Sequence, residues 1–288
     1  DTVAVMYRGQ IIEEAAVPTF FAKPRQAYSR TLVAALPDLS TFREPAEKPP
    51  LLELDQVSVH FPVRKGLLRR VVDTTRAVDD VSLHIARGET YALVGESGSG
   101  KSTLGRAILG LESLSGGHIR FAGSRLEHLG RSGYLPFRRR IQVIFQNPHS
   151  SMNPRLRVGD IVAEGILSLH PEWGEADRDA RVAALLERVQ LPANSAGRYP
   201  HEFSGGQLQR IAIARALAVE PELIICDEPT SALDVSIRAD VLALLADLQR
   251  DAGVSYLFIT HDLSIVPQLA HRVGVMRHGQ LVEQDSAQ

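Results

Sequence analysis

The chain has little cysteine, no long apolar run and no excess of positive charge. Its 288 residues include one cysteine, Cys226, which excludes an internal disulfide, and no cysteine and histidine cluster has zinc-site spacing. The net charge of -2 provides no basic field for a phosphate backbone, so nucleic acid is not an expected partner. No apolar run is long enough to span a bilayer, so we expect any membrane association to be peripheral.

What the chain does have is 44% hydrophobic residues, enough for one large core or two, and a glycine-rich stretch of unusual specificity. The stretch Gly95 to Thr103 fits the pattern G-x-x-x-x-G-K-S/T. An apolar run, Thr90 to Val94, precedes it, and a helix-compatible run, Leu104 to Leu109, follows it. The order of strand, glycine turn and helix predicts a phosphate-binding loop rather than a structural turn.

The chemistry of such a loop is anion capture by backbone N-H groups. Glycines leave no side chain between those groups and a phosphate, and the positive end of the following helix dipole favours negative charge. We expect Lys101 to reach the outer phosphates and the Ser102 hydroxyl to ligate magnesium. The residues predicted to cradle the phosphates are Gly95, Glu96, Ser97, Gly98, Ser99, Gly100, Lys101, Ser102 and Thr103.

A second site is predicted at the end of the apolar segment Leu223 to Cys226, where Asp227 and Glu228 follow. A fully apolar strand belongs inside a parallel sheet, and its terminal acids then project from the edge where ligands bind. We expect Asp227 to hold magnesium through its water shell and Glu228 to polarise the attacking water. Two solvent-exposed acids are the alternative, which the phosphate loop disfavours.

A third site is predicted at a well-defined helix start. Ser204 and Gln207 form a capping box, so their backbone and side-chain groups satisfy each other. Gly205 and Gly206 lower helix propensity and expose the first amides, which a purely structural interpretation explains poorly. We therefore expect a further anion site here.

The two ends of the chain resemble each other. Residues 1–18 align without a gap on residues 271–288, with Val3, Met6 and Gly9 matching Val273, Met276 and Gly279. Both copies predict a strand, a turn and a strand, so we expect an internal repeat longer than this sequence. Chance similarity between two amphipathic hairpins is the alternative.

The remaining segments divide the chain further. Residues 38–50 are rich in proline and charge and are predicted to be a linker. The alternation of Val57, Val59 and Phe61 predicts a strand that ends at Phe61, whose ring either stacks on an adenine or belongs to the core. Residues 161–217 are mostly helix-compatible and predict a helical insert between strands.

Together, these residues resemble the nucleotide-binding subunit of ABC transporters over nearly the whole chain. Residues 95–103 resemble the Walker A loop, residues 203–207 the signature motif, and residues 223–228 Walker B. Gln146 resembles the Q-loop glutamine, Asp234 belongs to a D-loop-like segment, and His261 resembles the switch histidine. Phe61 falls near the adenine-stacking position. A single histidine beside an aspartate, such as His261 beside Asp262, is by itself more often structural. Its place in the order of these motifs favours a functional role.

The resemblance implies an α/β fold, with a P-loop NTPase (RecA-like) core, an antiparallel β subdomain and a helical subdomain inserted at about residues 148–218. It also implies that residues 1–37 close a preceding cassette, that 38–50 link the two cassettes, and that 51–288 form the second cassette without its C-terminal tail. In this family, ATP lies between the Walker loop of one cassette and the signature serine of the other. The expected contacts across that interface are Ser204, Gly205, Gly206, Gln207 and Asp234, and the expected magnesium ligands are Ser102, Gln146 and Asp227.

Several segments narrow the resemblance to the oligopeptide and dipeptide import branch, which also includes nickel and glutathione importers. The segments are residues 143–154, 199–202, 234–237 and 23–37. Gln26-Ala27 replaces the branch's frequent His-Pro, and the cysteine-bearing tail motif is absent, so an iron-sulfur cluster is not expected within this sequence. The implied partners are two transmembrane permease subunits and a substrate-binding protein, at the cytoplasmic face of the membrane.

Two other functions stay open. A soluble ABC ATPase of DNA repair or translation would need no permease, but it typically carries zinc-binding cysteines or a long charged linker, and neither is visible. A regulatory nucleotide sensor that does not hydrolyse ATP is disfavoured, because Asp227, Glu228 and His261 are all present.

Overall fold

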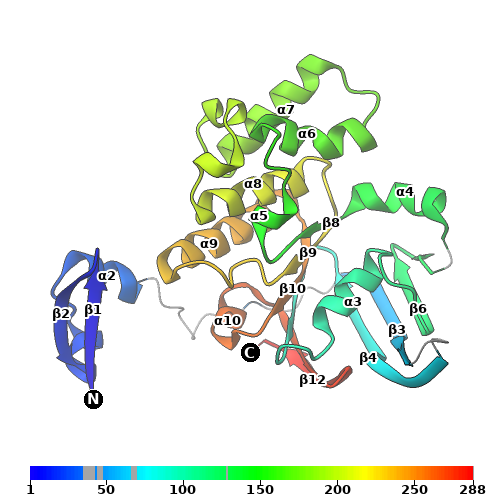
Figure 1. Cartoon of the computed structure of the whole chain (residues 1–288), viewed down its shortest axis with the longest axis horizontal. Coiled ribbons are helices and arrows are strands. Elements are labelled where there is room, and N and C mark those ends of the chain that lie inside the picture. Colours follow the sequence, from blue (N-terminus) through cyan, green and yellow to red (C-terminus); the bar gives the residue numbers. More distant parts are fainter. Residues whose placement is uncertain (35–42, 44–47, 66–69, 128, 288) are drawn as a thin grey trace.

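The computed structural model describes residues 1–34, 43, 48–65, 70–127 and 129–287 (Figure 1). Its centre is a six-stranded sheet in the order β12-β11-β5-β10-β9-β8. Neighbouring strands from β11 to β8 are parallel, and β12 is antiparallel to β11. The strands are β5 (Thr90–Val94), β8 (Ile141–Ile144), β9 (Leu223–Asp227), β10 (Ser255–Thr260), β11 (Arg272–Arg277) and β12 (Gln280–Ser286).

The sheet's register brings the ends of three strands together. Thr260 at the end of β10 pairs with Val94 at the end of β5, and Ile259 pairs with Asp227 at the end of β9. β5 and β10 are buried along their whole lengths, as expected for apolar strands covered on both faces. The carboxyl ends of the central strands therefore form one edge, from which the predicted phosphate loop and the predicted acids emerge.

A second, antiparallel sheet lies beside the first, with the order β4-β3-β6-β7. Its strands are β3 (Pro50–Lys65), β4 (Arg70–Ala86), β6 (Gly116–Phe121) and β7 (Ser124–Arg125). Helix α3 (Lys101–Ile108) contacts strands of both sheets. Leu104 and Ile108 on this helix are fully buried in one apolar cluster with residues from both sheets, so α3 is held firmly behind the phosphate loop.

A block of helices is inserted between β8 and β9, at the top of Figure 1. Its helices are α5 (Pro148–Ser151), α6 (Val158–Leu169), α7 (Glu175–Arg188) and α8 (Gly205–Leu217), with short 3-10 turns at residues 193–197 and 200–202. The remaining helices of the core are α4 (Arg131–Arg140), α9 (Val235–Ala252) and α10 (Val266–Leu269). The predicted α/β fold, with an antiparallel subdomain and a helical insert, is confirmed.

The N-terminal residues form a hairpin, β1 (Thr2–Tyr7) with β2 (Gln10–Ala16), followed by α1 (Val17–Ala22) and α2 (Ala27–Ala34). This hairpin repeats the β11–β12 hairpin at a constant offset of 270 positions. All six paired positions coincide, from Thr2 opposite Ala16 and Arg272 opposite Ser286 to the innermost pairs, and the register shifts at the same place. The match seen in the sequence is therefore a match in strand pairing.

The turns and the closing hydrogen bonds of the two hairpins also coincide. Arg8 and Gly9 have left-handed φ angles of 50° and 79°, against 48° and 84° at His278 and Gly279. Past the second strand, the Val17 N-H donates to the Asp1 carbonyl at 3.1 Å, and the Ala287 N-H donates to the His271 carbonyl at 2.9 Å. The two hairpins thus agree in their pairing, their turn and their closing hydrogen bond.

The surroundings of the two hairpins differ. Met276 is 1% exposed, whereas its counterpart Met6 is 62% exposed. Strand β11 pairs with β5 on its other edge, but among the described residues β1 pairs only with β2. The N-terminal hairpin stands apart from the sheets (blue in Figure 1). It therefore has an apolar face that the described residues leave open.

One detail differs from the sequence predictions. The strand predicted to end at Phe61 continues through it to Lys65, because the chain stays paired with β4 as a long hairpin arm. Most of the predicted linker, residues 38–42 and 44–47, lies outside the described residues. Within it, Arg43 donates from Nη1 to Oε1 of Gln249 on α9 at 2.7 Å.

Candidate functional site

The loop between β5 and α3 follows a path that only glycine permits at two points. A Cβ added at Gly95 would lie 2.1 Å from the Met276 carbonyl oxygen, and one at Gly100 would lie 2.0 Å from the Ala77 carbonyl oxygen. Both glycines also have positive φ angles, 154° and 105°. Close approach to neighbouring backbone therefore explains these glycines and holds the loop in one shape.

Lys101 lies inside this loop with its side chain buried. Its Nζ donates to the carbonyl oxygens of Gly95 and Glu96, both at 2.7 Å. Burial lowers the pKa of the Lys101 ammonium, and the carboxylates of Glu228 and Asp227 oppose that change. The ammonium is thus a partly desolvated cation, which a phosphate can approach with little competition from water.

Asp227 at the end of β9 lies next to the start of α3. Its Oδ1 accepts a hydrogen bond from the Ser102 hydroxyl at 2.8 Å. Burial raises the pKa of the Asp227 carboxyl, and this hydrogen bond partly offsets the rise. A buried carboxylate beside a hydroxyl is a donor set that suits magnesium, whose charge would compensate the desolvated acid. Ser102 and Asp227 therefore fit the predicted metal position.

Glu228 occupies the next position and turns away from the strand. Its φ angle is 48°, uncommon for a residue with a side chain, and its N-H donates to the Ile259 carbonyl at 3.0 Å. Its Oε2 lies 3.2 Å from Nδ1 of His261, and accepts from Nε2 of Gln146 at 3.0 Å. The acid is thus held between two polar side chains from two other loops. Gln146 reaches Glu228 here rather than the Ser102 and Asp227 pair.

A cavity of about 1070 Å³ joins these groups. It is lined by most of the loop together with Gln146, Glu228 and His261, while Ser99 and Asp227 are not among its lining residues. Three residues of β4 and three from the β11–β12 hairpin complete its wall, and sequence reasoning did not predict any of them: Thr75, Arg76, Ala77, Val275, His278 and Gly279.

The hairpin wall is bonded directly to the phosphate loop. The Gly279 N-H donates to the Ser99 carbonyl at 3.0 Å, and the Gly279 carbonyl accepts from the Asp79 N-H at 2.8 Å. The sequence analysis identified Gly279 as part of the repeat, but nothing in the sequence indicated that this glycine lines the cavity. Its turn therefore supports the loop from a segment far along the chain.

Phe61 is not among the residues that line the cavity. It pairs across the strands with Thr75, which does line it, and its side chain is 38% exposed. Its stacking on an adenine stays a prediction.

The predicted capping box at α8 is confirmed. The Ser204 hydroxyl accepts from the Gln207 N-H at 3.4 Å, and Gln207 Oε1 accepts from the Ser204 N-H at 3.0 Å. Ser204 and Gly205 are exposed and do not line the cavity. We expected that packing would not explain Gly205 and Gly206. For Gly206 this expectation is wrong, because a Cβ there would lie 2.4 Å from Cγ2 of Ile237 on α9.

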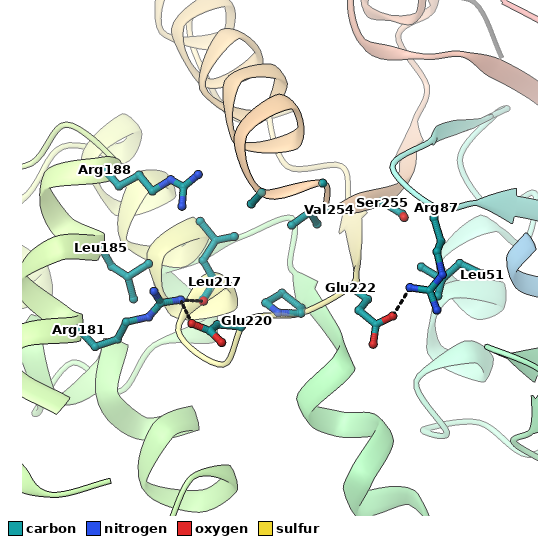
Figure 2. Close-up of a pocket in the computed structure, with 13 residues that line it drawn as sticks. Leu51, Arg87, Arg181, Leu185, Arg188, Leu217, Glu220, Glu222, Val254 and Ser255 are labelled. Atoms are coloured by element: carbon teal, nitrogen blue, oxygen red, sulfur yellow. Dashed lines mark hydrogen bonds and ion pairs between the residues drawn. The ribbon is translucent and has the colours of Figure 1, made fainter. Parts of the chain in front are cut away.

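A second cavity, of about 470 Å³, lies at the opposite edge of the sheet, where β9 and β10 begin (Figure 2). Arg87 pairs with Glu222 at 2.5 Å, and Arg181 pairs with Glu220 at 3.4 Å (Figure 2). The carbonyl ends of α8 and α9 also border it, so cations and anions are mixed there. It is not a second polyphosphate site.

The described helices include none that could cross a membrane, since no helix there is both long and apolar enough. Cys226 on β9 is fully buried and burial raises the pKa of its thiol, so it behaves as a small apolar residue.

The parallel sheet, the glycine loop leading into α3 and the acids at the end of β9 define a P-loop nucleotide-binding protein. Comparison with known families agrees and is more specific: residues 78–231 match the ABC transporter family, and the chain belongs to that family.

Curated relatives are similar along the whole chain. It is 47% identical over 288 residues to the peptidoglycan transport ATP-binding protein YejF of Agrobacterium fabrum, covering 100% of this chain and 52% of that protein. It is 46% identical to the glutathione import ATP-binding protein GsiA of Escherichia coli K12, covering 98% of this chain and 49% of that protein. The chain thus spans about half the length of these relatives.

Solved structures share the fold. The cbiO1 protein of Clostridium perfringens, described as part of the ABC transporter complex cbiONQ, superposes with a TM-score of 0.72 at 29% identity, over 83% of this chain and 90% of that one. The ATP-binding cassette MJ0796, as a dimer in a post-hydrolysis state bound to ADP and Pi, has a TM-score of 0.72 at 27% identity, over 82% of this chain and 99% of that one.

Proposed function

We propose that this chain binds and hydrolyses ATP as a cassette of an ABC importer for small peptides or peptide-like molecules. The observation that carries the proposal is the Glu228 carboxylate, held by His261 and Gln146 at the mouth of the loop that contains Lys101. Relatives named for glutathione import and peptidoglycan transport support the choice of importer and of cargo class.

Within the cavity, the loop residues bind the triphosphate and the strand-end residues act on it. The amides of residues 95–103 and the Lys101 ammonium hold the β- and γ-phosphates. Ser102 and Asp227 would hold a magnesium ion, which would neutralise phosphate charge when bound. The described residues contain no group of three or more His, Cys, Asp or Glu side chains that could hold another metal.

Glu228 orients the attacking water and takes its proton. The acid is 15% exposed, so it is shielded yet open to the cavity, and His261 Nδ1 fixes its Oε2 at 3.2 Å. His261, whose side chain is 56% exposed, can turn its other ring nitrogen toward the γ-phosphate. Gln146 donates to the same oxygen of Glu228. If a bound phosphate takes over this contact, the Gln146 side chain must move, so its position depends on whether the γ-phosphate is present.

The start of α8 serves a second nucleotide. Ser204, Gly205 and Gln207 are exposed and lie outside this chain's own cavity, yet they present a capped, amide-rich helix end. Asp234 caps α9 without a side-chain hydrogen bond of its own, so its carboxylate is also available to a partner. In a paired arrangement these groups contact the γ-phosphate held by the facing cassette. The dimeric form of a similar cassette supports this geometry.

The facing cassette precedes this one in the same parent chain. The β1–β2 hairpin supports this proposal, since it repeats the hairpin that walls the described nucleotide cavity, down to its turn and closing bond. Residues 1–37 then end the first cassette, residues 38–50 link the two, and residues 51–288 form the second, with the inserted helices at about 148–218. Relatives of about twice the length are consistent with two such units.

The implied assembly includes two transmembrane permease subunits and a substrate-binding protein, with this chain at the cytoplasmic face of the membrane. We expect a permease to contact the surface around Gln146 and the inserted helices, where motion of the insert would reach it. The alternative is a soluble ABC ATPase of repair or translation, which would have no membrane partner.

The test is reconstitution. The full-length parent protein, coexpressed with the permease genes that neighbour its own, should copurify with both permeases. In vesicles loaded with MgATP, it should accumulate a labelled dipeptide or glutathione, while the Glu228→Gln protein should not. Full-length protein that hydrolyses ATP but copurifies with no permease would favour the soluble alternative. Uptake of nickel alone would correct the cargo class.

A further inference from the structure

The first turn of α9 lies between three loops that the proposed function uses. It begins at Val235, directly after the loop 231–234, whose last residue, Asp234, is the N-cap. Ile237 fills the space beside Gly206 at the start of α8, where even a methyl group would lie within 2.4 Å. The next residue, Arg238, faces the segment that follows His261. One helical turn thus contacts the start of α8, the loop 231–234 and residues 261–264, which follow β10 and are called the switch loop.

The Arg238 guanidinium makes the connection. Its Nη1 donates to Oδ2 of Asp262 at 2.6 Å, and its Nη2 lies 3.5 Å from the Leu233 carbonyl. The side chains of Arg238 and Asp262 are 28% and 30% exposed, so the pair is more shielded than an ordinary surface ion pair. The Nε atom is buried and has no hydrogen-bond partner among the described residues.

Asp262 is itself tied into the switch loop. Its Oδ1 accepts hydrogen bonds from both the N-H and the hydroxyl of Ser264, and its own N-H donates to the Thr260 hydroxyl at 3.0 Å. These bonds, with the charges of Arg238 and His261, hold the pKa of Asp262 below its ordinary value despite burial. The switch loop is therefore held together by its own hydrogen bonds, and Arg238 binds it from α9 through Asp262.

Helix stability does not account for an arginine at this position. A cation in the first turn of a helix faces the positive end of the dipole and is unfavourable. Arg250, in the last turn of the same helix, shows the favourable arrangement and pairs with Asp247 and Asp251 on α9. Arg238 thus occupies an unfavourable place on its own helix in exchange for contacts with two other loops.

We propose that Arg238 is a positioning residue that makes the switch loop, the loop 231–234 and the start of α8 move together. The proposal rests on the ATPase function above. Since His261 serves this chain's own ATP whereas Ser204 serves the facing one, Arg238 would link the two nucleotide sites. Loss of γ-phosphate contact at His261 would shift Asp262, then the first turn of α9, and then Gly206 and Ser204.

The test uses the full-length protein with its permeases and five variants. Four are single, namely Arg238→Ala, Arg238→Lys, Asp262→Asn and Arg250→Ala, and the fifth is the double variant Arg238→Ala, Asp262→Asn. We expect Arg238→Ala to lower kcat for MgATP about tenfold, with the Kd for MgATP changed less than about twofold. Arg238→Lys, which keeps the charge but loses the two-pronged contact, should recover part of kcat. Arg250→Ala should match the parent protein. The double variant Arg238→Ala, Asp262→Asn should be no slower than either single variant, since both remove one linkage.

A merely structural role would give a different result. In that case activity would fall only because fewer molecules fold and bind MgATP. The kcat per molecule of bound MgATP would be unchanged, and this result would overturn the proposal. Unchanged kcat in Arg238→Ala, or additive losses in the double variant, would also overturn it. Failure of the proposed function gives a different result, because Glu228→Gln would then leave the turnover of ATP unaltered. If Glu228→Gln lowers turnover and Arg238→Ala does not, only the proposed role of Arg238 is contradicted.

Discussion

Oε2 of Glu228 lies 3.2 Å from Nδ1 of His261, although the two residues follow different strands. The parallel register of β9 and β10 produces this contact, because it pairs Asp227 with Ile259 and so leaves the next residues of both strands at one edge. The same Glu228 oxygen also accepts from Gln146. A strand register therefore places an acid, a histidine and an amide around one point in the cavity.

Replacing the histidine tests the use of this contact. We expect His261→Ala to lower kcat for ATP hydrolysis by about 100-fold, the scale for a lost group in the transition state, with little change in MgATP affinity. Steady-state turnover and nucleotide titration of the full-length protein measure the two effects. His201→Ala is the matched control, since His201 is exposed and lies outside the cavity. Equal turnover in His261→Ala and the control would exclude a catalytic role for His261.

Loss of the loop lysine should instead affect binding. Lys101→Ala removes the one lysine among the described residues that line the cavity, and we expect the Kd for MgATP to rise at least about tenfold. Titration calorimetry measures it, with Lys23→Ala, an exposed lysine of the N-terminal segment, as the control. Undiminished affinity in Lys101→Ala would contradict the assignment of this cavity to a polyphosphate.

The close backbone approach at Gly100 makes a further prediction. Gly100→Ala would place a methyl group against the Ala77 carbonyl in a backbone conformation that alanine rarely adopts, so the loop must shift. We expect MgATP binding to fall at least about tenfold and the melting temperature to drop by a few degrees. Gly197→Ala is the control, because nothing lies within 4 Å of its added Cβ and its φ is not positive. Equal melting and binding in the two variants would refute the contact.

His271 gives the protein a pH-dependent stability. Burial lowers the pKa of its imidazole to about 4, and its Nδ1 accepts from the Thr90 N-H at 3.0 Å. The unfolded chain takes up this proton near pH 6.5 while the folded chain does not, so the histidine's contribution is complete above pH 6.5 and is lost as pH falls toward 4.

We expect His271→Gln to flatten the stability profile in that range. The difference between parent and variant should change by about 1 to 2 kcal/mol between pH 7.5 and 4.5, allowing for partial exposure of the ring. Urea unfolding at a series of pH values measures it. A constant difference across the range would show that the imidazole titrates alike in both states.

The duplicated hairpin predicts opposite responses at matched positions. Met276→Glu would bury a charge beside the phosphate loop and should lower stability by at least about 3 kcal/mol. Met6→Glu should be nearly neutral in the 288-residue chain, where this side chain is 62% exposed, but should destabilise the full-length parent protein. Thermal unfolding of both lengths measures the pair. Neutrality of Met6→Glu in the full-length protein would contradict a preceding cassette packed on this hairpin.

The local parts of the site could be predicted from the sequence because their signals are contiguous. The phosphate loop, the acids after β9 and the capping box at Ser204 each occupy a few consecutive residues whose chemistry depends on neighbours in the chain. The helical insert followed from the long helix-compatible stretch between two apolar strands, whereas the α/β fold as a whole was implied by the family resemblance.

The remaining parts depended on contacts between distant segments. Ala77 and Gly279 approach the loop only because β4 and the last hairpin meet there, and nothing local marks Thr75 or Arg76 as wall residues. Alternation could not show that the strand runs past Phe61, since residues 61, 62 and 72–76 of the two paired strands are exposed and carry no buried face there. The sequence suggested only an anion-binding role for Gly206. Its packing role was hidden, because its partner Ile237 lies on another helix.

Hydrolysis of MgATP by the full-length Glu228→Gln protein tests the central claim most directly. The account predicts that turnover falls by about 100-fold or more while MgATP stays bound with undiminished affinity, because only the proton acceptor has been removed. Turnover equal to that of the parent protein would contradict the assignment of Glu228, and with it the proposal that this cavity is the engine of an importer.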